Sequence, residues 1–222
     1  MPPAAPDEEV RLKRRATIAA VVLALVLGGF SLDLTRPKAV GAKASMPDPG
    51  LTGAPGQGSC YSCHSAGLND IFGSILLFGV PPTYTPGQDY LLVAAITRAT
   101  GASRWGFEAT ALRSGGQMAG SFGDSSNAVG ELTQLGIEYV SQTTLEGFDG
   151  TFADSLGAGW VFRWTAPPQG SGTVTFYAAG AACNNDNAAT GDYTYTTTGS
   201  SIEGAATAVE ATTWGKIKQI YR

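Results

Sequence analysis

The chain has 222 residues, of which 30 are glycine, and 14% of its residues are charged. This length suits one domain with a sizeable hydrophobic core, once terminal signals are set aside. The glycine content, with frequent Thr, Ser and Tyr in the second half, is typical of an all-β domain outside the cytoplasm. Between Ser45 and Glu210 there are four basic residues against fourteen acidic ones. Because phosphate binding needs a basic face, this balance argues against nucleic acid as a partner.

Residues 1–34 are predicted to be an export signal or a membrane anchor. The basic sequence RLKRR precedes an apolar run from Ala16 to Phe30, and this order leaves the basic end in the cytoplasm and exports the rest. The run is long for a signal peptide and a little short for a full span, and the small-x-small site at 42–44 is distant. These features favour an uncleaved N-terminal transmembrane helix, with the remaining chain in the periplasm or at the cell surface.

Residues 35–58 contain several Pro and Gly and show little periodicity, which predicts a flexible linker. From residue 59 to 200, short apolar or alternating segments between turn signals predict an all-β, antiparallel immunoglobulin-like β-sandwich of seven or eight strands. Residues 116–123 are expected to extend the sheet after a Gly-Gly turn, and 124–150 to form a long loop with one short strand. The short strand is expected at 137–144. The other strands are expected at 71–79, 89–97, 104–113, 159–167, 172–182 and 191–198.

Residues 201–222 are predicted to be a C-terminal tail. Four apolar residues there alternate with Lys216, Lys218 and Arg222. This pattern resembles a short recurring tail of some exported bacterial proteins. A short amphipathic segment that packs on the domain or on a membrane surface is the alternative.

The most specific motif is GSCYSCHSAG, residues 58–67, in which Cys60, Cys63 and His64 form the Cys-x-x-Cys-His sequence of covalent haem attachment. The two thiols would form thioethers to the porphyrin vinyl groups, and His64 would be the proximal iron ligand. Three of the four Cys and His residues of the chain fall within these five positions. Haem c is attached outside the cytoplasm, where the export segment would deliver the domain, so one covalent haem c per chain is predicted.

Other uses of these cysteines are open. A zinc site would need a second pair of ligands, and only Cys183 remains. A Cys60–Cys63 disulfide is compatible with an oxidising compartment. A thioredoxin-type redox pair would start a helix in a βαβ unit, and the sequence shows no such pattern. Cys183 is expected to be buried and inert, with an intermolecular disulfide as the alternative.

The second axial position of the iron has no obvious ligand. His64 is the only histidine, so a second imidazole from the same chain is excluded. A thioether sulfur is a suitable ligand, and Met118 is preferred over Met46, which lies in the predicted linker. The glycines around Met118 permit a close approach to a haem. An open position, Lys43 and Tyr61 are the alternatives.

Several blocks in order are similar to the bacterial choice-of-anchor V domain proteins, whose pattern is distantly similar to Reelin-type β-sandwich domains. The blocks are TGAPGQGSCYSCHS (52–65), YTPGQDYLLV (84–93), RWGFEATAL (104–112), WVFRWTAPPQGSGTVTFYAAG (160–180) and GDYTY (191–195). The resemblance covers about residues 50–198. It implies an exported, surface-associated Reelin-like domain with a haem signature at its start. It does not indicate a particular reaction. A histidine often follows the EYV segment in this pattern, where this chain has Gln142.

The sequence thus predicts an exported or membrane-tethered monohaem c-type cytochrome domain, which transfers one electron to a redox partner or senses a small ligand. The alternative is a cell-surface adhesion or binding module in which Cys60 and Cys63 form a disulfide and the partner is a surface ligand. A hydrolase has little support, because the only histidine belongs to the motif and the carboxylates form no recognisable acid–base pair. Four aromatic residues are expected in the core, some of them against the porphyrin: Trp105, Phe107, Trp160 and Trp164.

Overall fold

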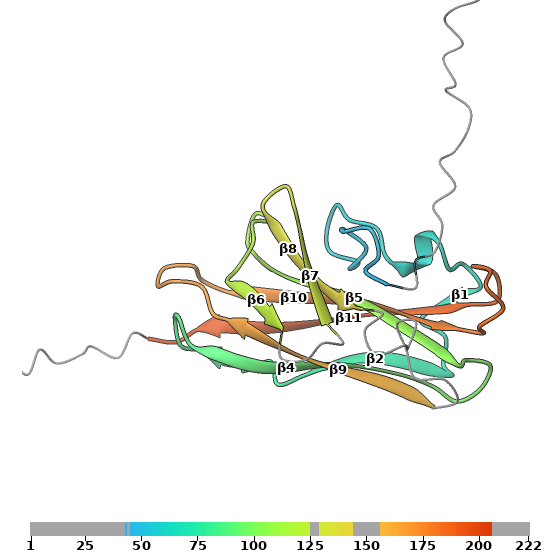
Figure 1. Ribbon diagram of the computed structural model, residues 1–222. Helices are drawn as coiled ribbons and strands as arrows, with labels where there is room; N and C mark the ends of the chain where they lie inside the picture. The colour runs from blue at the N-terminus through green and yellow to red at the C-terminus, as the bar shows by residue number, and fades with distance from the viewer. Residues whose placement is uncertain (1–42, 44, 125–128, 144–155, 206–222) are drawn as a thin grey trace, which may run out of the picture. The chain divides into compact units, whose positions relative to one another are not determined.

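The computed structural model describes residues 43, 45–124, 129–143 and 156–205. Within them the chain forms two facing β-sheets and one short 3-10 helix, η1 (Cys60–Ser62), so the predicted all-β sandwich is confirmed (Figure 1). The predicted N-terminal helix, residues 1–34, lies outside the described residues. Among the described residues, no helix has the length and apolar character to cross a membrane.

The larger sheet runs in the order β1-β11-β10-β5-β8-β7, with β3 paired to the other end of β11. Its strands are β1 (Gly67–Leu68), β3 (Thr83–Tyr84), β5 (Arg104–Arg113), β7 (Val129–Gln134), β8 (Ile137–Gln142), β10 (Val174–Cys183) and β11 (Tyr193–Glu203). The smaller sheet runs in the order β2-β4-β9-β6. Its strands are β2 (Gly73–Phe78), β4 (Asp89–Arg98), β6 (Ser121–Asp124) and β9 (Gly157–Thr165).

The core lies between the two sheets and contains the aromatic residues that the alternation predicts. Successive side chains of a strand point to opposite faces, so one half of each central strand is buried between the sheets. The rings of Phe107 and Trp160 stack across this space with 4.7 Å between their centroids. All four aromatic residues predicted for the core are at most 3% exposed: Trp105, Phe107, Trp160 and Trp164.

Several elements differ from the sequence prediction, which expected neither β1 nor β3. The expected loop at 124–150 contains a second strand, since β7 and β8 form a hairpin whose turn residues Leu135 and Gly136 both have positive φ, as in a type I′ turn. After its Gly-Gly turn the chain bridges back from Met118 to Leu112 and then enters the smaller sheet as β6. β11 continues to Glu203, into the predicted tail.

Residues 45–58 pack on the larger sheet, on the face directed away from the smaller one (Figure 1). We call this face the outer face and residues 45–58 the lead-in. Met46 N donates to Gln142 O at 3.0 Å, and Leu51 N donates to the Glu108 carboxylate at 2.5 Å. The described part of the predicted linker is therefore an ordered layer over the sheet.

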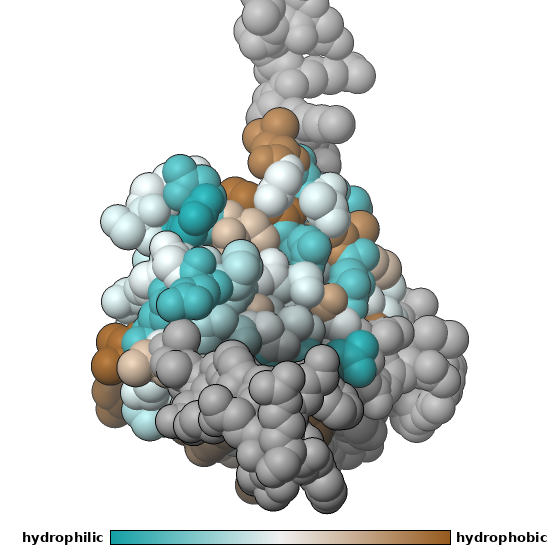
Figure 2. All heavy atoms as spheres, turned by 90° about the vertical axis from the view of Figure 1, so that its left-hand side faces the viewer, coloured by the Kyte–Doolittle hydropathy of each residue, from teal (hydrophilic) through white to brown (hydrophobic). Residues whose placement is uncertain are grey.

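On the end of the domain seen in Figure 2, polar side chains predominate among the described residues.

Candidate functional site

The Cys-x-x-Cys-His motif forms a single helical turn on the outer face. Ser59 caps η1, its Oγ accepting from Tyr61 N at 3.3 Å, and Cys60 O accepts from Cys63 N at 3.2 Å and from His64 N at 2.9 Å. Residues three and four positions apart lie on the same side of such a turn. Cys60, Cys63 and His64 therefore share one side, as attachment of one porphyrin requires.

The two thiols of the motif differ in burial. Cys60 is 8% exposed and packs in a cluster with Ala179 and Ala181 of β10, which project from the outer face. Burial, assisted by the nearby charge of Glu108, raises the pKa of Cys60 to about 12. Cys63 is less buried, and burial followed by the charge of Asp48 raises its pKa. Cys60 is thus a protonated, poorly nucleophilic thiol in this packing, since the thiolate is the reactive form.

His64 is held by a buried carboxylate. Its Nδ1 lies 2.6 Å from Oδ2 of Asp192, whose side chain is 1% exposed and precedes β11. The other oxygen of Asp192 accepts from Asn184 N at 2.9 Å, which ties it to the β10–β11 connection. Because Nδ1 is occupied by Asp192, Nε2 is the ring nitrogen available to a ligand. A carboxylate on the remote nitrogen is the usual way in which a metal-binding histidine is oriented.

Cys183, the last residue of β10, also lies at the motif. Its Sγ is 3.8 Å from His64 Nδ1, and the donor atoms of His64, Cys183 and Asp192 all lie within 4.8 Å of one another. Burial and the charge of Asp192 raise the pKa of the Cys183 thiol. Sequence reasoning expected Cys183 to be inert and gave Asp192 no role. Both lie more than 100 residues from His64 along the chain, so no local signal indicated the contact.

Glu108 lies under the lead-in, near Cys60, whose pKa its charge helps to raise. It projects from β5 onto the outer face, where it pairs in register with Ala179, and it is fully buried. Burial raises its pKa to about 8, against the opposing effect of hydrogen bonds from Leu51 N and Gly50 N. Its Oε1 has no hydrogen-bond partner among the described residues. Sequence reasoning did not single out this residue.

Met118 is not brought to the motif. It is bridged to Leu112 near the end of β5, whereas Arg104, at the start of β5, pairs with Cys183 beside His64. The two points are eight residue positions apart along β5, which corresponds to about 27 Å at a strand rise of about 3.4 Å per residue. Ligation of one iron by His64 and Met118 is incompatible with this arrangement.

Gln142 stands where the resemblance to choice-of-anchor V domain proteins leads one to expect a histidine. Its side chain is hydrogen-bonded to the larger sheet. Its Oε1 accepts from Phe107 N at 2.8 Å, and the side chain is 5% exposed. Its side chain lies against Gly106, and in the hairpin it pairs in register with Val129, a core residue, so the register does not place it on the outer face with Cys60. The aromatic residues predicted to touch the porphyrin also face the interior between the sheets.

The donor set at the motif fits a covalent haem by three criteria, whereas the burial of Cys60 against β10 means that its thiol has to become accessible for attachment. The two thiols and the imidazole share one side of a turn, all three described cysteines are free, and Asp192 leaves Nε2 of His64 for the iron. The core aromatic residues do not contribute, because they face the interior between the two sheets. Any haem held by this turn would therefore lie outside the sandwich rather than between its sheets.

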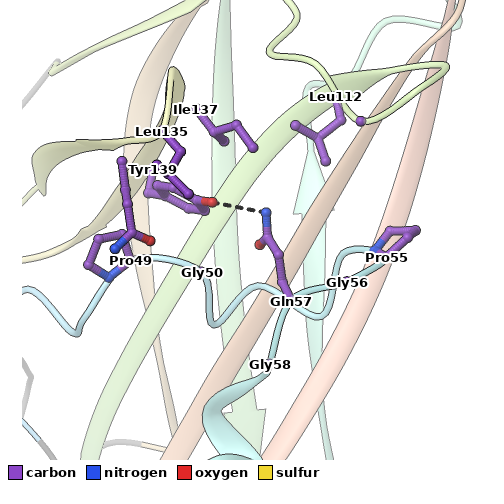
Figure 3. A pocket seen from close by; sticks show the side chains of 12 residues that line it. Pro49, Gly50, Pro55, Gly56, Gln57, Gly58, Leu112, Leu135, Ile137 and Tyr139 are labelled. Carbon is purple, nitrogen blue, oxygen red and sulfur yellow. Dashed lines mark hydrogen bonds between the residues drawn. The ribbon is translucent and has the colours of Figure 1, made fainter.

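A cavity of about 340 Å³ is lined by the lead-in, by the end of β5 and by the β7–β8 hairpin (Figure 3). All of its lining residues are uncharged, and none is Cys60, Cys63 or His64. Gln57 Nε2 donates to Tyr139 Oη at 2.9 Å across it, as the dashed line shows. This cavity is therefore separate from the motif.

No protein-family model and no curated protein matches the chain. Among solved structures it is similar to the Reelin-N domain of F-spondin, with 20% identity and a TM-score of 0.43, covering 66% of this chain and 96% of that one. The human F-spondin reeler domain gives 20% identity and 0.40, covering 60% and 89%. A cohesin module of a Clostridium perfringens family 33 glycoside hydrolase gives 8% and 0.43, covering 60% and 97%. At these TM-scores the likeness carries no functional conclusion.

Proposed function

We propose that this chain is an exported or membrane-tethered monohaem c-type cytochrome domain, in which Cys60 and Cys63 would hold the haem and His64 would ligate its iron. The observation that supports it most is the contact of His64 Nδ1 with the buried carboxylate of Asp192, directly after the Cys-x-x-Cys turn. A haem at this turn would supply one-electron iron chemistry. The chain itself contributes two attachment points and an imidazole whose orientation is set by the fold.

The role that follows is one-electron transfer to a partner protein or sensing of a small ligand. His64 is the only histidine, and Met118 lies at the other end of β5. An iron position left open by the described residues would favour ligand sensing. A ligand from another part of the chain, or from another molecule, would favour electron transfer.

The location outside the cytoplasm is part of the same proposal. It rests on the basic and apolar order of residues 11–30 and on the resemblance to exported choice-of-anchor V domain proteins. The acidic domain would then face a partner whose docking surface is basic, since complementary charges guide association.

The test is expression of the full chain with a cytochrome c maturation system, followed by a denaturing gel stained for haem peroxidase activity. A stained band is expected for the wild type and for Cys183→Ser, the matched cysteine control. It should be lost in the double variant Cys60→Ser/Cys63→Ser. Equal staining of the double variant and the wild type would refute attachment at this motif.

A surface-binding module is the second candidate, because the uncharged cavity beside Gln57 and Tyr139 lies apart from the motif. In this case Cys60 and Cys63 would form a disulfide and no haem would be attached. Intact mass before and after reduction separates the two functions. A haem-free chain that gains two hydrogens on reduction, despite active maturation, would favour the binding module.

A further inference from the structure

Asp192 is placed to act on His64 and is itself immobilised. It has one oxygen on His64 Nδ1 at 2.6 Å and the other on Asn184 N at 2.9 Å. The connection that carries Asn184 is closed by its own hydrogen bonds, since Asn184 Nδ2 donates to Asp186 Oδ2 and to Thr190 O. With both oxygens engaged and 1% of the residue exposed, the carboxylate cannot turn away from the imidazole without breaking the connection.

This contact has an electronic consequence for any metal on the opposite ring nitrogen. A carboxylate only accepts hydrogen bonds, so Nδ1 of His64 carries the hydrogen and Nε2 presents its lone pair. A buried carboxylate on Nδ1–H raises the basicity of the imidazole as a ligand. A more basic axial ligand stabilises ferric over ferrous iron, and second-shell hydrogen bonding is one of the means by which a protein sets haem potential.

We propose that Asp192 is a positioning residue that sets the tautomer of His64 and makes it a strongly donating axial ligand, which lowers the reduction potential of the site. This inference rests on the proposed function. It also gives a role to the GDYTY block at 191–195, whose aspartate the fold brings to the histidine of the haem motif.

The variant Asp192→Asn separates this role from a purely structural one. The asparagine keeps an oxygen for Asn184 N, so the β10–β11 connection is retained, but its amide nitrogen cannot accept from His64 Nδ1. Asp192→Glu keeps the carboxylate and serves as the conservative rescue. Asp89→Asn is the charge control, because Asp89 is an exposed aspartate on β4, in the smaller sheet.

Two readouts are measured on the full chain. In the haem-loaded protein, spectroelectrochemical titration should give a higher reduction potential for Asp192→Asn than for the wild type. The expected difference is at least 59 mV, which for one electron is a tenfold change in the equilibrium between ferric and ferrous iron. Asp192→Glu should lie between them, and Asp89→Asn should match the wild type. In the haem-free protein, the ¹⁵N spectrum of the single imidazole should show the Nδ1–H tautomer, and Asp192→Asn should remove it.

The outcomes distinguish this inference from the proposed function. Haem attachment with equal potentials in the wild type and Asp192→Asn would overturn the inference alone. An Nε2–H tautomer in the haem-free wild type would overturn it as well. Failure of every variant, including the wild type, to attach haem would overturn the proposed function and this inference with it.

Discussion

Glu108→Gln tests the buried carboxyl that the lead-in covers. Glu108 is fully buried, and its pKa is raised from 4.5 to about 8, mainly by burial. A carboxyl with a raised pKa binds its proton more tightly in the folded state. Its contribution to stability is therefore complete below pH 4.5 and is lost as the pH rises towards 8. Glutamine keeps a similar shape and cannot ionise, so the variant should lack this dependence.

The magnitude follows from the two pKa values. Between pH 6 and pH 8 the unfolded chain has lost the proton and the folded chain largely retains it, so the free energy of unfolding should fall by about 2 kcal/mol in the wild type. Urea unfolding at pH 6, 7 and 8 measures this fall. Asp89→Asn is the control, since Asp89 is an exposed carboxyl. A wild type and a Glu108→Gln variant that lose stability equally over this interval would refute the reasoning.

Three further predictions follow from the same geometry. Trp164→Ala should lower the free energy of unfolding by about 3–5 kcal/mol in urea titrations, because Trp164 is fully buried and its Nε1 donates to Ala119 O; Leu135→Ala, at a residue 97% exposed, should cost almost nothing. Met118→Ala should leave the visible and near-infrared spectra of the haem protein unchanged, and loss of a sulfur–iron band would contradict the strand register. The domain without its basic termini should pass through heparin at physiological salt, and retention would contradict the expectation from its acidic charge.

The alternating strands were predictable because one face of each is buried. Arg104–Arg113 shows this best, since its predicted and observed bounds coincide and its odd-numbered residues face the core. The strand at 137–144 was predicted and is β8. Its partner β7 was missed because it is mostly polar and exposed, so it lacks the alternation that marks a half-buried strand. The lead-in was expected to be flexible from its Pro and Gly content. Its backbone is instead paired to Gln142 and Glu108, which lie far along the chain.

The site was predictable only in its local part. Cys60, Cys63 and His64 form one turn because they are contiguous, and the motif itself indicates this. The partners Cys183 and Asp192 depend on the register of β10 with β5 and β11 and on the hairpin between β10 and β11. The same register places Met118 at the opposite end of β5, although its glycine-rich surroundings suggested a close approach to the haem.

The most direct test of the central proposal is the intact mass of the mature chain from cells with an active cytochrome c maturation system, combined with its pyridine haemochrome spectrum. The proposed function predicts a chain heavier by one haem, with the spectrum of a haem joined by two thioethers and no mass change on addition of a disulfide reductant. A colourless chain at its unmodified mass less two hydrogens, with the disulfide mapped to Cys60 and Cys63, would contradict it.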